Sequence, residues 1–199
     1  MQIDISEVPQ PFIDLFTKTI GLSSDEFDYL LSHFRKSYLP KRFNYLCSGQ
    51  VTKQKAYLKK GCTRTFTTDE TGRDHILFFA FEDWWIGDFR SYNTGLPGTQ
   101  TIQAIEDCEL FCISKAEFDR IEEEIPKLFQ WYEVKQKRHF YAMMQRLEEV
   151  KTLTPEQRYL NLIEKHPSIF QRIPLQYIAQ YLDIEPPSLS RMRKRLSEK

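Results

Sequence analysis

AYLKKGCTRTFTTDETGRDHILFFAF, residues 56–81, is the stretch of the sequence that decides the fold. Two runs rich in β-branched and aromatic residues lie on either side of Asp69–Gly72, the clearest hairpin turn in the chain. Similar short runs follow at residues 99–105 and 109–114, again separated by turn residues. Their spacing of about ten residues is typical of antiparallel sandwiches and barrels. We therefore expect an antiparallel β-roll or jelly roll over residues 37–114.

Helical patterns flank this β region on both sides. Before it, apolar residues between 12 and 34 recur at helical spacing, and Ser24 is the expected N-cap of the second of two short helices. After it, Ser114 opens a helix with a capping box, because a glutamate follows three residues later. Pro126 then fits the first turn of a longer helix that runs to about Lys151. The combination predicts an α+β protein with helices around the roll.

The long helix carries an apolar stripe with near-heptad spacing and one polar interruption. A helix of about seven turns after a compact β unit leaves one of its faces without a covering element. The same helix of a second subunit would cover that face most simply. We predict a homodimer whose interface is built from Phe129, Tyr132, Gln136, Phe140, Met143, Leu147 and Val150.

The C-terminal region has the pattern of a helix-turn-helix. Residues 174–182 and 186–196 form two short helical patterns joined by a turn of three residues. The second helix has a polar and basic side, and Ser and Arg side chains suit phosphate oxygens and guanine edges. The predicted DNA contacts are Gln176, Ser188, Ser190, Arg191, Arg193, Lys194 and Arg195. The competing interpretation is a basic helical tail without a nucleic-acid partner.

The formal net charge is zero, with 28 Lys and Arg against 28 Asp and Glu, but the charges are segregated along the chain. Nine basic residues and no acidic one lie between Tyr29 and Thr68, whereas eight acidic residues lie between Glu106 and Glu124. RMRKRLSEK, residues 191–199, is basic again. Because nucleic-acid binding depends on the local electrostatic field, a neutral total charge does not exclude DNA.

Several classes of protein are excluded by the sequence. No apolar run approaches the ~20 residues that span a bilayer, and no basic segment precedes an apolar stretch at the N-terminus, so we expect a cytoplasmic protein without a membrane partner. Four cysteines without a CxxC pair indicate buried thiols in a reducing compartment and no metal site. Four scattered histidines, and the absence of GxGxxG, Walker and HExxH motifs, indicate that the protein is not an enzyme and has no cofactor.

The order of these features resembles the Crp/Fnr family of bacterial transcription regulators over nearly the whole chain. The resemblance is carried by Tyr57–Gly61, by the hairpin Asp69–Arg73, by the pocket turn Trp85–Asp88, and by Ile178–Gln180 with Ser188–Arg191 in the DNA-reading unit. It implies double-stranded DNA and RNA polymerase as partners of a homodimer. It also implies three domains: a cyclic-nucleotide-binding-like β-roll sensor over residues 1–125, a dimerisation helix over 126–152, and a winged helix-turn-helix over 153–199.

The sequence departs from the family at the effector pocket. Gly87–Asp88 keeps a shortened carboxylate at the pocket turn, but Gly98–Thr99 replaces the Arg-Ser pair that clamps the phosphate in cyclic-AMP-binding relatives. Met143–Met144 replaces the Thr-Ser pair that contacts the purine in those relatives. We therefore expect no response to cyclic AMP. An unknown small-molecule effector would bind at Trp85, Gly87, Asp88, Thr99, Gln100, His139 and Met143.

The reading helix departs as well. Pro186–Pro187 stands where relatives carry Arg-Glu, although Arg191 matches their second reading arginine. Two prolines fit the start of a helix and supply no base contact. The alternative function is therefore a ligand-binding or protein-interaction module that has a cyclic-nucleotide-binding-like domain and has lost specific DNA binding.

Overall fold

The computed structural model describes residues 3–197, apart from the side chains of residues 132, 133, 135, 136, 138, 139 and 197. The chain forms two compact units. Unit 1 holds the chain up to Thr65 together with Phe79–Lys137, and unit 2 holds Phe66–Phe78 together with the chain after Lys137. The tip of the 56–81 hairpin therefore belongs to unit 2.

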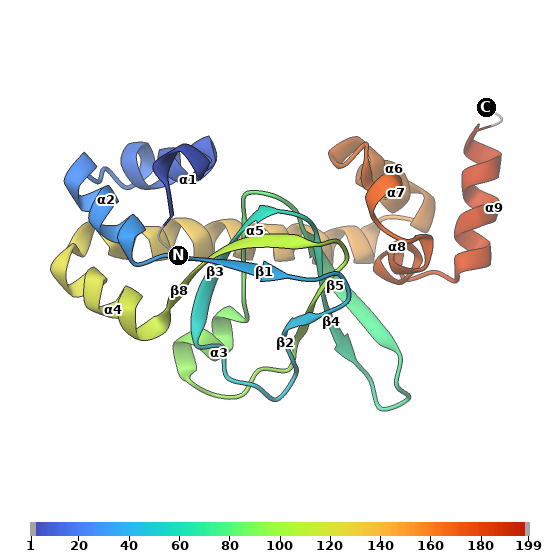
Figure 1. The fold of residues 1–199 in the computed structure, drawn as a ribbon. Coiled ribbons are helices and arrows are strands. Elements are labelled where there is room, and N and C mark those ends of the chain that lie inside the picture. The colour runs from blue at the N-terminus through green and yellow to red at the C-terminus, as the bar shows by residue number, and fades with distance from the viewer. Residues whose placement is uncertain (1–2, 198–199) are drawn as a thin grey trace. The chain divides into compact units, whose positions relative to one another are not determined.

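The strands of residues 3–197 form two four-stranded sheets (Figure 1). Strands that are distant in the sequence pair with one another, and the pairs of sheet 1 are antiparallel. Antiparallel sheets with flanking helices confirm the predicted α+β class. Sheet 1 has the order β1 (Arg35–Leu39), β8 (Cys108–Ser114), β3 (Gln54–Lys60) and β6 (Trp84–Ile86), and sheet 2 has the order β2 (Asn44–Leu46), β7 (Thr101–Ala104), β4 (Thr63–Thr68) and β5 (Asp74–Ala80).

The predicted hairpin turn joins β4 to β5. The Asp69 amide donates a hydrogen bond to the Arg73 carbonyl at 3.0 Å, which closes the turn. The Asp69 carboxylate accepts hydrogen bonds from the Thr71 hydroxyl at 2.6 Å and from His75 at 2.6 Å. These contacts hold the pKa of Asp69 well below its usual range.

The central strands of sheet 1 are buried on both faces because successive side chains alternate between two cores. On β3, Ala56 and Leu58 pack with Leu110 in an inner core. Tyr57, between them, packs with Phe111 in a second core on the other face of the sheet. A run such as AYL therefore appears continuously apolar although its side chains serve two cores.

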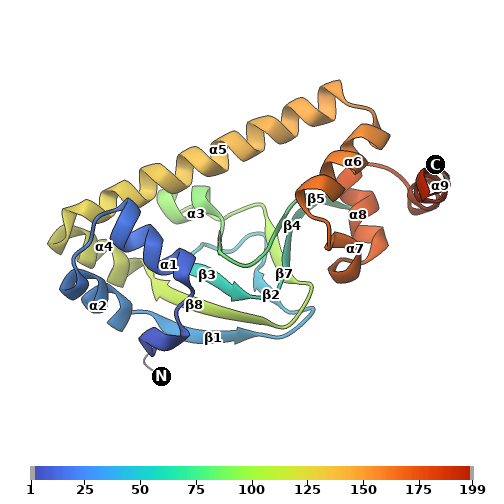
Figure 2. The same cartoon turned by 90° about the horizontal axis from the view of Figure 1, so that it is seen from above.

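The second core lies between sheet 1 and the N-terminal helices. It is centred on Phe12, whose ring lies 4.9 Å from Tyr57 and 5.9 Å from Trp85 between centroids. Ser23 caps the second helix in a capping box with Glu26, one residue earlier than predicted, because its backbone is still extended. In Figure 2, the helices of this layer lie together at the end of the roll where β8 finishes. They are η1 (Ile5–Glu7), α1 (Gln10–Asp14), the π-turn η2 (Leu15–Thr19), α2 (Ser24–Ser32) and α4 (Lys115–Glu124).

The segregated charges of unit 1 compensate one another. β1, in the basic run, pairs with β8, in the acidic run, so that the two runs lie side by side. Lys59 Nζ lies 3.2 Å from a Glu109 carboxylate oxygen, and the Lys41 amide donates to the Asp107 carboxylate at 2.8 Å. Arg35, Lys36 and Lys59 of the basic run therefore have acidic neighbours within unit 1, whereas Lys55 and Arg64 are buried.

Helices account for all the regular structure between residues 125 and 197. The turn η3 (Pro126–Leu128) leads into α5 (Phe129–Thr152), which is followed by α6 (Pro155–Lys165), α7 (Ile169–Arg172), α8 (Leu175–Leu182) and α9 (Pro186–Ser197). Ile178, Ala179, Leu182 and Leu189 are fully buried, so α8 and α9 share a core as predicted. Residues 153–197 contain no strand, and the wing expected from the family resemblance is not among them.

None of the described helices has both the length and the apolar content of a membrane-spanning segment.

Candidate functional site

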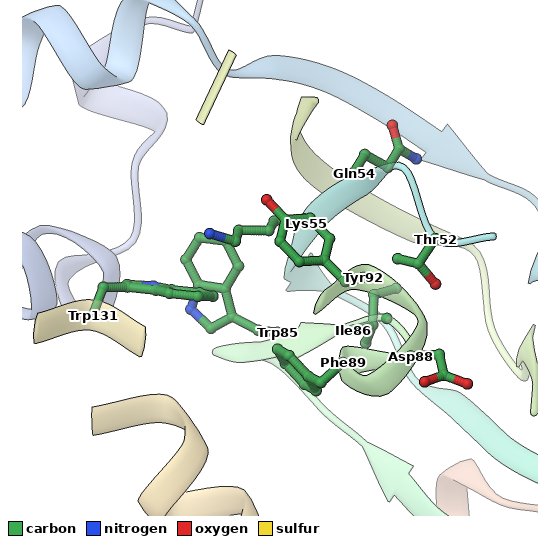
Figure 3. A pocket seen from close by; sticks show the side chains of 10 residues that line it. Thr52, Gln54, Lys55, Trp85, Ile86, Asp88, Phe89, Tyr92 and Trp131 are labelled. Carbon is green, nitrogen blue, oxygen red and sulfur yellow. The ribbon is translucent and has the colours of Figure 1, made fainter. Parts of the chain in front are cut away.

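A small cavity lies beside the predicted pocket turn, in unit 1 (Figure 3). Its volume of about 10 Å³ leaves room for about one water molecule. A cyclic nucleotide does not fit into this space. The lining residues are Thr52, Gln54, Lys55, Trp85, Ile86, Gly87, Asp88, Phe89, Tyr92 and Trp131.

The Asp88 carboxylate has a structural partner. It caps helix α3 (Phe89–Thr94) by accepting a hydrogen bond from the Ser91 amide at 2.9 Å, and Asp88 is buried. A Cβ atom on Gly98 would lie 2.4 Å from Asp88 Oδ2, so that position requires glycine. The carboxylate that we expected to serve an effector therefore holds α3 and its neighbouring loop in place.

The other predicted pocket residues do not gather at one point. Trp85 lines the cavity, but most of its ring packs in the aromatic core with Phe12 and Trp131. Thr99 is exposed and Gln100 is half-buried, and neither lines the cavity. Met143 is exposed in unit 2, and the side chain of His139 lies outside the described residues.

Lys55 is the cation of this cavity, and it is not among the site residues predicted from the sequence. Its side chain is buried, and Nζ lies 3.0 Å from the centroid of the Phe118 ring and 4.2 Å from that of Trp131. Burial lowers the pKa of the ammonium to about 7, an effect that the nearby carboxylates of Glu122 and Asp119 oppose. Lys55 precedes Tyr57 by two residues, so both side chains lie on the same face of β3. This alternation along the strand could have indicated that Lys55 is buried.

The stability of the wild type relative to Lys55→Met should rise with pH between about 7 and 10. The folded-state pKa of Lys55, about 7, lies below its ordinary value of 10.5, so the folded protein binds fewer protons in this range. The cost of burying the charge is complete below pH 7 and disappears as the pH approaches 10.5. The slope should reach at most ~1.4 kcal/mol per pH unit.

Urea unfolding at several pH values, followed by tryptophan fluorescence, measures this difference, since all three tryptophans lie in unit 1. Lys53→Met, at an exposed neighbouring position, is the matched control and should give a flat difference. A flat difference for Lys55→Met would show that the amine keeps an ordinary pKa.

A larger concavity of about 440 Å³ lies along residues 45–54 of unit 1. It is lined by Tyr45, Leu46, Gln50, Val51, Thr52, Lys53 and Gln54, none of which we had assigned to the effector pocket. Its volume is in the usual range for small-ligand sites. One continuous segment forms this concavity, so a search for sequence motifs that are distant from one another does not reveal it.

The buried thiols agree with the expectation from the sequence. Cys62, Cys108 and Cys112 are buried and form no disulfide, whereas Cys47 is half-buried. Burial raises the pKa of Cys108 to about 11 and that of Cys112 to about 12, so both are protonated and unreactive at neutral pH. No cluster of metal ligands occurs among the residues that the structure describes.

Helices α8 and α9 carry the predicted DNA contacts in unit 2. Arg191 Nη2 donates a hydrogen bond to Ser188 Oγ at 3.3 Å, so the two residues lie on one face of α9 as their spacing predicts. Gln176, Ser190, Arg191, Lys194 and Arg195 are exposed, whereas Ser188 and Arg193 are half-buried.

Arg193 and Arg195 have partners on other helices of unit 2. The Arg193 guanidinium lies over the Phe170 ring at 4.3 Å, and Arg195 forms an ion pair with Glu156. We had expected these side chains to remain largely available to solvent. The pattern of α9 alone could not show the partners, because α6 and α7 supply them.

Two arginines that we had not singled out hold the C-terminal end of α8. Arg158 is buried and donates to the Leu182 carbonyl at 2.8 Å and to the Val150 carbonyl at 3.1 Å. Arg146 donates to the Tyr181 carbonyl. The last carbonyls of a helix have no partner within it, and cations are favoured there. Arg158 precedes Leu162 by one helical turn, so its place on the apolar face of α6 could have indicated a buried role.

Arg158→Met should lower the free energy of unfolding of unit 2 by about 2–4 kcal/mol, because buried carbonyls lose charged hydrogen-bond donors. Far-UV circular dichroism during urea unfolding reports on the helices of both units, whereas tryptophan fluorescence reports on unit 1 alone. A transition seen only by circular dichroism therefore belongs to unit 2. Arg195→Met removes an exposed ion pair and should cost less than about 1 kcal/mol. Equal losses in the two variants would mean that Arg158 contributes no more than a surface charge.

The predicted dimer stripe is exposed along α5. Phe140 is 59% exposed, Met143 53% and Leu147 48%, which is unusual for large apolar side chains in register. Phe129 and Val150 are exposed too. The side chains of Tyr132 and Gln136 lie outside the described residues.

Comparison with protein-family models places a known domain on this roll. Residues 44–124 match the cyclic nucleotide-binding domain. The match runs from β2 to the end of α4 and includes the pocket turn and every lining residue of the small cavity except Trp131. A search of curated protein sequences found no significant match.

The fold extends beyond the cyclic nucleotide-binding domain. Three bacterial proteins of known structure each align with a TM-score of 0.73. The c-di-GMP responsive global regulator CLP of Xanthomonas campestris is 13% identical, with 88% of this chain and 92% of that chain covered. FixK2 of Bradyrhizobium japonicum is 11% identical, with coverage of 83% and 85%. A Crp/Fnr-family protein of Eubacterium rectale is 16% identical, with coverage of 96% and 88%.

These identities are low, so the likeness establishes a shared fold and no shared ligand. The proteins of Xanthomonas campestris and Eubacterium rectale are regulators. The small cavity and the structural role of Asp88 are properties of this chain's own cyclic nucleotide-binding domain.

Proposed function

We propose that the protein is a DNA-binding transcription regulator of the Crp/Fnr type. It acts as a homodimer that binds a palindromic operator through a helix-turn-helix formed by α8 and α9. The observation that carries the proposal is the common core of α8 and α9, which leaves Arg191 and Lys194 exposed on α9 after a cyclic nucleotide-binding domain. Two regulators with the same fold, from Xanthomonas campestris and Eubacterium rectale, support this order of domains.

Binding to DNA can be tested without knowledge of the operator. The full-length protein is titrated into a fluorescent duplex of mixed sequence at low salt, and binding is followed by anisotropy. Affinity should fall steeply as salt is added, because Lys and Arg displace counterions from phosphates. Absence of binding at low salt would favour the alternative, a ligand-binding or protein-interaction module with this sensor domain.

Cyclic AMP should neither bind strongly nor raise the affinity for DNA. The cavity holds about 10 Å³, Asp88 caps α3, and no arginine stands at Gly98–Thr99 to pair with a cyclic phosphate. Calorimetry with cyclic AMP, repeated in the presence of duplex DNA, should give no measurable heat. A dissociation constant in the micromolar range would show that the pocket opens and that its remaining residues suffice.

A further inference from the structure

Three aromatic rings lie around the amine of Lys55. Nζ lies 3.0 Å from the Phe118 centroid, 4.2 Å from that of Trp131 and 4.9 Å from that of Tyr92. These rings come from α4, α5 and α3, and all of them belong to unit 1. Among the described residues no ion pair or hydrogen bond is made by Nζ, although the carboxylates of Glu122 and Asp119 act on its charge.

Two hydrogen-bond donors of the same cavity lack acceptors. The indole nitrogens of Trp85 and Trp131 are buried and have no hydrogen-bond partner in the described part of the chain. Trp85 is 7% exposed and Trp131 1%, and their rings lie 5.0 Å apart. In Figure 3 the Lys55 side chain reaches toward both indoles. Buried donors without acceptors are costly, so this site is suited to a small acceptor group.

The size of the cavity restricts what can meet the amine. A volume of about 10 Å³ admits a water-sized molecule and excludes sugars, nucleotides and aromatic aldehydes. A very small electrophile is therefore the reactant that suits this space. Carbon dioxide has three heavy atoms and no net charge, so it does not carry the desolvation cost of an anion into a buried site.

We propose that Lys55 is a site of reversible carbamate formation with carbon dioxide. The ammonium first releases a proton to solvent. The lone pair of neutral Nζ then attacks the carbon of carbon dioxide, an N–C bond forms, and one C=O bond pair becomes the carboxylate charge. Nζ loses a second proton to solvent. The product is an N-linked carboxylate, and no oxidant, reductant or further reactant is needed.

Some neighbouring charges favour this reaction and others oppose it. Burial lowers the pKa of Lys55 to about 7, so a large share of the amine is neutral near pH 7. Glu122 and Asp119 of α4 favour the ammonium, whereas Lys115 of the same helix favours the neutral amine. Lys115 also lies over one of the three rings around Lys55, because its Nζ is 4.7 Å from the centroid of the Tyr92 ring. The same cation would attract a carbamate.

Carbamate formation would move the side chain within the site. Ring faces attract a cation and repel an anion, whereas the N–H edge of an indole donates to an anion. A carbamate on Lys55 would therefore leave the face of Phe118 and turn to the indole nitrogens of Trp85 and Trp131. Trp131 lies in the first turn of α5, so the modification acts directly on the start of that helix.

The experiment uses the full chain equilibrated with ¹³C-bicarbonate at constant ionic strength, with natural-abundance bicarbonate and chloride as controls. Carbamates are trapped by alkylation with triethyloxonium and located by peptide mass spectrometry, while ¹³C NMR detects the carbamate carbon. We expect one predominant trapped site, Lys55, with occupancy that rises from pH 6 to pH 8. Lys55→Arg should abolish the signal, and Lys53→Arg, at an exposed neighbour, should leave it unchanged.

Trp131→Phe provides a second variant that keeps the apolar ring and removes one donor. It should lower the occupancy of Lys55 several-fold while the protein remains folded. The proposal is overturned if the wild type shows no adduct on Lys55, or if exposed lysines are trapped to the same extent. It is also overturned if Trp131→Phe folds and retains full occupancy. If Lys55→Arg fails to fold, the presence or absence of a trapped adduct on Lys55 of the wild type still tests the proposal.

Discussion

Met143→Glu combined with Leu147→Glu should convert the protein to monomers at micromolar concentration. The two side chains are 53% and 48% exposed in the single chain and lie one helical turn apart on α5. In a two-fold dimer the variant would bring four carboxylates together in an apolar seam, and the cost is several kcal/mol for each buried ion. Multi-angle light scattering measures the mass directly.

The matched control adds the same two charges to the opposite side of the helix. Gln145 and Thr152 are exposed and lie off the apolar stripe, so Gln145→Glu with Thr152→Glu should leave the mass of the dimer unchanged. A monomeric wild type would contradict the dimer. Monomers in both double variants would mean that acidic charge disrupts α5 itself, which circular dichroism would detect.

The sheets could be predicted from the sequence because their signals are local. The turn at Asp69–Gly72 and the runs on either side of it appear as β4 and β5. The short strands β1, β2 and β6 were not singled out, since three to five residues give too little alternation. Their pairing with β8, β7 and β3 is what establishes them as strands.

The candidate site was harder to predict than the fold. Gly87–Asp88, predicted as the pocket turn, lines the small cavity, but the carboxylate caps α3, and nothing in the local sequence distinguishes a cap from a ligand contact. Lys55 was counted within a basic run although it is buried, because charge counting ignores which face of a strand a residue occupies. Arg158 was overlooked for the same reason on a helix.

The contacts of α9 show a third reason why the candidate site is hard to predict from the sequence. The spacing of Ser188 and Arg191 on one face follows from helical geometry and is present in the structure. The contacts of Arg193 with Phe170 and of Arg195 with Glu156 depend on how α6 and α7 pack, which periodicity does not reveal. Arg191 is therefore the clearest base-reading candidate among the predicted residues.

Arg191→Ala should weaken binding to a selected operator by about 1–3 kcal/mol and relax the preference at one base pair in each half-site. Arg191 is exposed, lies one turn into α9, and is directed by its hydrogen bond to Ser188. In a two-fold dimer the two α9 helices would enter successive major grooves about one helical turn of DNA apart, so the operator should be a rough palindrome. Anisotropy titrations with the selected operator and a scrambled duplex measure the effect.

Lys194→Ala is the matched variant, since it removes a neighbouring cation that we assign to a phosphate. It should weaken binding to both duplexes about equally and reduce the slope of affinity against salt by about one for the lost phosphate contact.

Pro186→Ala with Pro187→Ala should leave the preference between duplexes intact, because the prolines only begin the helix. If Arg191→Ala lowers both affinities equally, Arg191 contacts phosphate and not a base. The reading role would then pass to Ser188 or Ser190, whose hydroxyls lie on the same first turns of α9.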